Sequence, residues 1–67
     1  MAFEKFKQNI IAYMKKAGVS DSVEFNHDTD KGLYSAWIPG EEILITCRES
    51  GLGMSARFHN HVYPIKA

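Results

Sequence analysis

Residues 33–48 read LYSAWIPGEEILITCR, two apolar runs on either side of Pro39-Gly40. Apolar and polar side chains alternate in both runs, and a period of two is typical of a strand with one face on a core and the other in water. Pro-Gly is a strong turn dipeptide, and the connection between the runs is short. The stretch therefore predicts an antiparallel hairpin with strands at 33–38 and 42–48.

Similar alternating runs lie on both sides of this hairpin. Val23 and Phe25 alternate with polar residues upstream, and residues 54–63 alternate downstream. Each run is separated from the hairpin by a short segment that contains glycine and turn-forming polar residues. Short connections place consecutive strands side by side and antiparallel, so the sequence predicts a four-stranded meander that ends at Pro64.

The beginning of the chain predicts a helix over residues 2–17, because apolar side chains recur there three and four residues apart. Gly18 follows directly, at the position where a left-handed C-terminal cap is common. One helix against one sheet buries both apolar faces. We therefore expect a single α+β domain over residues 1–67, with the N-terminal helix packed on one face of a four-stranded antiparallel meander sheet. The helical stripe consists of Phe3, Phe6, Ile10, Ile11, Tyr13, Met14 and Ala17.

The side-chain parity of each strand predicts which residues lie beneath the helix. The strand at 33–38 leaves two choices, because either its even-numbered or its odd-numbered residues can face the core. The even-numbered set is preferred since it contains the β-branched Ile38 and no serine. Trp37 then lies on the opposite face; in the other arrangement it is a core residue. The predicted core positions of the sheet are Val23, Phe25, Tyr34, Ala36, Ile38, Ile43, Ile45, Cys47, Met54, Ala56, Phe58 and Val62.

A two-layer domain leaves the face opposite the helix uncovered. Contiguous exposed apolar surface on a small chain marks an interaction site, and Trp, Tyr and Arg are enriched where binding energy concentrates at interfaces. We therefore predict a non-enzymatic, regulatory or inhibitor-like module whose uncovered face binds a protein partner or a second copy of itself as a homodimer. The predicted contact residues are Trp37, Leu44, Arg48, Arg57, His59, His61 and Tyr63.

Nucleic acid is the alternative partner for the same face. Aromatic rings on a sheet can stack on bases, and Arg48 and Arg57 can contact phosphates. Against this alternative, eight basic and eight acidic side chains cancel, whereas nucleic-acid-binding domains usually carry a basic excess. Glu24 and Glu42 also lie on the predicted face, so a protein partner is favoured.

Metal binding is the least favoured hypothesis. His59 and His61 are spaced so that one face of a strand can offer two imidazoles to a zinc ion. A structural zinc site needs two more ligands, and strand parity places Cys47 on the other face. Among aliphatic neighbours that thiol stays protonated, and no candidate nucleophile has a base within reach. The sequence therefore predicts no metal, no cofactor and no enzymatic activity.

Size and cysteine content bound the cellular setting. With one cysteine in 67 residues, no internal disulfide can form. A domain with so small a core is often stabilised by association with another chain. No apolar run approaches the ~20 residues that span a bilayer. The first residues lack the apolar segment of a signal peptide. These features predict a soluble, cytoplasmic protein that does not act on membranes.

Overall fold

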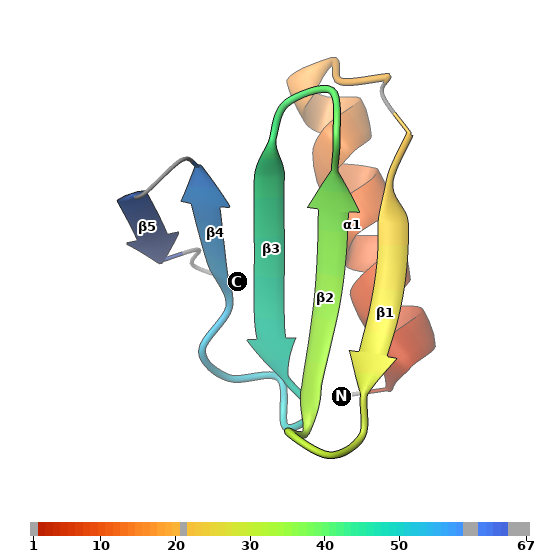
Figure 1. Ribbon diagram of the computed structural model, residues 1–67. Coiled ribbons are helices and arrows are strands. Elements are labelled where there is room, and N and C mark those ends of the chain that lie inside the picture. The colour runs from red at the N-terminus through yellow and green to blue at the C-terminus, as the bar shows by residue number, and fades with distance from the viewer. Residues whose placement is uncertain (1, 21, 59–60, 65–67) are drawn as a thin grey trace.

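The computed structural model describes residues 2–20, 22–58 and 61–64, and within them a helix lies against an antiparallel sheet (Figure 1). The strands follow one another across the sheet in chain order, β1-β2-β3-β4-β5, each antiparallel to the next. The elements are α1 (Phe3–Ala17), β1 (Glu24–Asp28), β2 (Leu33–Ile38), β3 (Ile43–Arg48), β4 (Ser55–Phe58) and β5 (His61–Pro64).

The predicted α+β fold is confirmed in its N-terminal helix and antiparallel sheet, but the described residues form five strands rather than four. The strand predicted over residues 54–63 is two strands, because the chain reverses between Phe58 and His61, which are opposite each other in register.

This reversal changes the faces on which the side chains of β5 lie. Residues directly opposite each other in an antiparallel pair share a face. Val62 is opposite Arg57, and Tyr63 is opposite Ala56. Val62 therefore lies on the face away from the helix, and its predicted core position is wrong. Tyr63 and His61 lie on the helix side, so the face predicted for them is wrong as well.

The core lies between α1 and the first three strands (Figure 1). Phe6, Ile10 and Met14 are the buried residues of the helix and are spaced four apart, so they form one narrow stripe. The ring of Phe6 packs against the rings of Phe25 and Tyr34, with centroid distances of 6.3 and 5.6 Å. The buried residues of the sheet are Tyr34, Ala36, Ile38, Ile45 and Cys47.

The end of α1 confirms the predicted glycine cap. Gly18 has φ 74°, in the left-handed region that glycine enters without strain. Its N–H donates to the carbonyl of Lys15, and the N–H of Val19 donates to the carbonyl of Met14 at 2.9 Å. These two bonds satisfy carbonyls at the end of the helix and turn the chain back toward β1. No helix in the described part of the chain is long and apolar enough to cross a membrane.

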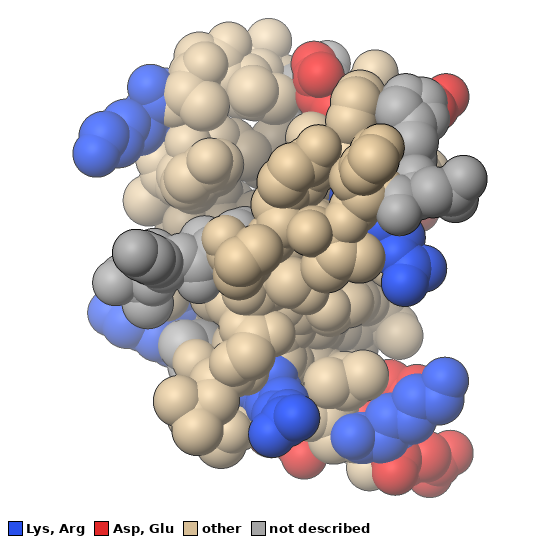
Figure 2. Space-filling model, turned by 90° about the vertical axis from the view of Figure 1, so that its left-hand side faces the viewer, with Lys and Arg blue, Asp and Glu red and all other residues tan. Residues whose placement is uncertain are grey.

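The helix covers only part of the sheet, and β4 and β5 extend beyond it (Figure 1). A helix about 10 Å wide spans two or three strands, whereas five strands spaced ~4.8 Å apart are roughly 19 Å across. Tyr13 and Phe58, both predicted in the core, are 58% and 40% exposed for this reason. Viewed from the β5 side, the middle of the surface is mostly uncharged, with lysine and arginine at its margins (Figure 2).

Candidate functional site

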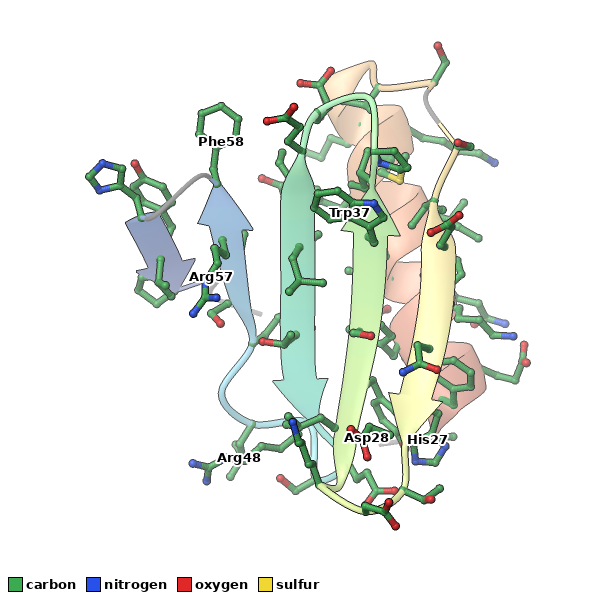
Figure 3. The ribbon with its side chains drawn as sticks, in the orientation of Figure 1. His27, Asp28, Trp37, Arg48, Arg57 and Phe58 are labelled. Atoms are coloured by element: carbon green, nitrogen blue, oxygen red, sulfur yellow. The ribbon has the colours of Figure 1, made fainter. Side chains whose placement is uncertain are left out.

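The indole of Trp37 projects from the face of the sheet opposite α1 (Figure 3). Its neighbours in β2, Ala36 and Ile38, are 0% and 4% exposed, whereas Trp37 is 37% exposed. The preferred parity of this strand is therefore confirmed, and the alternative with Trp37 in the core is excluded. Two-thirds of the indole is still covered, so the ring lies against the sheet and has little freedom to lose when a partner binds.

We call the face opposite α1 the open face and define it by three rows of residues that the strand register places side by side. The first row, in strand order, is Glu24, Trp37, Leu44, Arg57 and Val62. The second row is Asn26, Ser35, Thr46, Ser55 and Pro64. The third row is Asp28, Leu33 and Arg48.

Charge on the open face is separated across the strands. Glu24 and Asp28 lie on β1, at one edge, whereas Arg48 and Arg57 lie on β3 and β4. The carboxylate of Asp28 accepts hydrogen bonds from two backbone N–H groups of the following turn, each at 3.1 Å, which fixes it at the end of the strand. The first row therefore runs from an acidic edge through an apolar pair to Arg57, and Glu42, in the turn before β3, lines a hollow together with Arg57.

The second row, which ends at Pro64 opposite Ser55, crosses the middle of the open face. Its serines and threonine have short side chains that make polar contacts. Thr46 Oγ1 and Ser55 Oγ are 3.4 Å apart, and Ser35 Oγ donates to the carbonyl of Asn26 at 3.5 Å. Short, satisfied side chains let a second flat surface approach closely without leaving polar groups unpaired.

Two open hollows interrupt this surface, and both are lined by Leu44 and Arg57. One of them also reaches Thr46 and Ser55 of the second row. The other lies beside Trp37 and is also lined by Pro39 and Glu42. Hollows of this kind accept the side chains of another macromolecule but do not enclose a small molecule, because ligand sites bury most of their ligand. The geometry fits a docking surface better than a catalytic pocket.

The structure brings together most of the predicted contact residues. Trp37, Leu44 and Arg57 are neighbours in the first row, and Arg48 lies in the third. Val62 and Asp28 also lie on the open face and were not predicted there. Val62 is hidden from the alternation because the chain reverses between β4 and β5.

Of the predicted row of histidines and tyrosine, His61 and Tyr63 do not lie on the open face. Tyr63 lines a groove beside α1, together with Tyr13, Met14 and Phe58. The ring centroids of His61 and Tyr63 are 6.2 Å apart, on the helix side of the sheet. His59 lies outside the described residues. His61 and Tyr63 therefore cannot contact a partner that binds the open face, and the prediction is wrong for these two residues.

A different histidine forms the main polar contact outside the open face. Nε2 of His27, on β1, lies 2.5 Å from Oε2 of Glu49, in the turn after β3. The imidazole also packs against the rings of Phe3 and Tyr34, with centroid distances of 5.4 and 4.8 Å. This cluster connects the start of α1 to two strand ends and has a structural role. Among residues 2–20, 22–58 and 61–64, no three His, Cys, Asp or Glu side chains form a metal-binding group.

Cys47 is fully buried, and its burial raises the pKa of the thiol. Sγ lies 3.4 Å from the carbonyl of Arg48 and 3.7 Å from that of Leu52, as a protonated donor would. We expect the folded protein to react with a disulfide reagent at about pH 8 on the order of 100-fold more slowly than the protein in urea, because reaction requires opening. Absorbance of the released thiolate measures both rates. Equal rates in a protein that remains folded by circular dichroism would contradict a buried thiol.

Comparisons of the chain with protein-family models, with curated proteins and with solved structures give no match. Its function is therefore inferred from its own geometry and chemistry.

Proposed function

We propose that this protein is a non-enzymatic binding module whose contact surface for another protein is the open face. The observation that carries the proposal is the outward projection of Trp37 beside Leu44, toward one end of the strands, on a sheet face that no described element of the chain covers. An aromatic and an aliphatic side chain with arginine beside them have the composition of an interface core.

The free energy gained by covering the exposed part of Trp37 supports a role of the open face in protein binding. The exposed 37% of the indole corresponds to roughly 90 Å², and covering that area is worth about 2 kcal/mol. Leu44 and Val62 lie in the same row and extend the apolar area to either side of Arg57. Anchors of this kind give most of the binding energy of an interface, while the surrounding polar residues give complementarity.

The charge pattern favours protein over nucleic acid as the partner. Arg48 and Arg57 can contact phosphates, but a strand of nucleic acid laid across the open face meets the carboxylates of Glu24 and Asp28 at its other edge. A protein surface can present both charge signs. Such a module acts by occupying a partner's surface, as regulators and inhibitors do, and we expect a cytoplasmic partner because the single thiol suits a reducing compartment.

The substitution Trp37→Ala tests the proposal. We expect the variant to fold, with a loss of about 1 kcal/mol in stability because the indole is partly covered, and to bind its protein partner at least ~10-fold more weakly. Proteins captured from a lysate are identified by mass spectrometry, and each is then purified and titrated against wild type and variant. Tyr13→Ala is the matched control, since Tyr13 is an exposed aromatic on α1, and it should bind like wild type.

Two results would count against the proposal. One is a purified partner that binds Trp37→Ala and wild type equally. The other is binding of single-stranded or duplex oligonucleotides that weakens steeply between about 50 and 200 mM salt and is lost in Arg57→Ala, which would favour the nucleic-acid alternative.

A further inference from the structure

We propose that the open face binds a second copy of this chain, docked face to face about a twofold axis parallel to the strands. The inference rests on the proposed function, that this face binds protein, and adds the identity of the partner and the geometry of the contact.

The order of side chains in the first row selects this partner. From β1 to β4 the row is acidic, apolar, apolar and basic: Glu24, Trp37, Leu44 and Arg57. A twofold axis parallel to the strands, between β2 and β3, places β1 of one copy opposite β4 of the other and β2 opposite β3. Glu24 then lies opposite Arg57 of the second copy, and Trp37 lies opposite Leu44. Symmetry makes each of these contacts twice.

The same charges disfavour the other face-to-face arrangement. An axis across the strands would place β1 of one copy on β1 of the second, so that the carboxylates of Glu24 and Asp28 would meet one another. Like charges brought together at an interface oppose association and suppress the wrong arrangement. The separation of acidic β1 from basic β4 therefore favours the axis parallel to the strands.

Glu24 and Arg57 cannot satisfy each other within one copy. They lie three strand spacings apart, about 14 Å, and Trp37 and Leu44 stand between them in the row. Within one copy Arg57 lines a hollow together with Glu42, and a second copy would add Glu24 opposite Arg57 and a guanidinium opposite Glu24. Each ion pair would form next to an apolar contact that excludes water, where its effect is larger than on an open surface.

Shape and area are compatible with this contact. The short side chains of Ser35, Thr46 and Ser55 let a second sheet approach to the ~10 Å spacing of packed sheets. The open face measures roughly 20 Å by 20 Å, so two copies bury on the order of 1,000 Å² in total, near the lower limit of specific interfaces. We therefore expect a dimer that dissociates in the micromolar range.

Analytical ultracentrifugation over a dilution series of the full chain tests the dimer and its geometry. The mass should rise with concentration from 7.6 kDa to twice that value. Glu24→Arg and Arg57→Glu should each weaken the dimer at least ~10-fold, because each places like charges together at two symmetric positions. The double variant Glu24→Arg/Arg57→Glu restores both pairs and should return to within about threefold of wild type. Lys16→Glu, a reversal on the exposed side of α1, is the matched control and should have no effect.

Several results would overturn the inference. A wild-type protein that stays at 7.6 kDa throughout the series excludes the dimer. The proposed function still stands in that case if a purified partner protein binds wild type and binds Trp37→Ala at least ~10-fold more weakly. A dimer that Glu24→Arg strengthens, or that neither reversal changes, uses another arrangement. Circular dichroism monitors folding of each variant. If a reversal unfolds the chain, Glu24→Gln or Arg57→Gln replaces it and should weaken the dimer by about threefold.

Discussion

Replacing Phe6 with alanine is expected to leave most of the protein unfolded at room temperature. Phe6 is fully buried, and its ring packs against those of Phe3, Phe25 and Tyr34. Removing a buried phenylalanine side chain costs about 3–5 kcal/mol, and a core of this size supplies little more than ~3–5 kcal/mol of total stability. Urea titration followed by circular dichroism should show a cooperative transition for wild type and no folded baseline for the variant.

Tyr13→Ala is the matched control for this experiment. Tyr13 is an aromatic residue of the same helix, but it is 58% exposed beside the part of the sheet that α1 does not cover. Its removal should change the free energy of unfolding by less than ~1 kcal/mol. Phe6→Ala and Tyr13→Ala with equal urea midpoints would contradict the packing of one narrow helical stripe on β1, β2 and β3.

The elements that local patterns determine could be predicted from the sequence. The helix and its Gly18 cap follow from apolar spacing and from a backbone angle that only glycine adopts freely. The faces of β1, β2 and β3 follow from alternation with a period of two. Alternation does not give exact boundaries: it predicts Glu42 in a strand, but Glu42 has φ 53° and belongs to the turn, so β3 begins at Ile43.

The features that depend on chain reversal and on the width of the layers could not be predicted. Alternation continues across the reversal between Phe58 and His61, so it does not reveal where one strand ends and the next begins. Phe58 and His61 are paired although they are three positions apart, so this reversal moves Val62 to the face opposite the one that alternation predicts. The exposure of Tyr13 depends on how many strands one helix can cover, which requires the strand count first.

The candidate site, too, has features that could be predicted from local alternation and features that depend on how the strands pair. The parity of residues 33–38 places Trp37 on the open face, and the parity of the two following runs places Leu44 and Arg57 there. The rows across the strands were not predictable, because parity gives the face of a residue but not its register with the next strand. Glu24 opposite Trp37 and Arg57 opposite Leu44 come from the register alone, and the charge order that favours a second copy comes with them.

Ala36→Glu is expected to abolish folding, whereas the same substitution one residue later, Trp37→Glu, is expected to leave the chain folded. Ala36 is fully buried in β2, between Phe25 and Ile45 in register. Glutamate there overfills the space of a methyl group and buries a carboxylate, at a cost of at least about 4 kcal/mol. At position 37 the carboxylate remains in water, and the lost packing costs about 1–2 kcal/mol. Thermal unfolding by circular dichroism measures both.

The two variants separate the faces of one strand because their positions are adjacent and the introduced side chain is the same. Trp37→Glu should also sediment as a monomer, since in the dimer its carboxylate would be pressed against Leu44 of the second copy without a partner. If Ala36→Glu folds and Trp37→Glu does not, the indole is a core residue. The open face then has no anchor, and the proposed binding function and the dimer fail together.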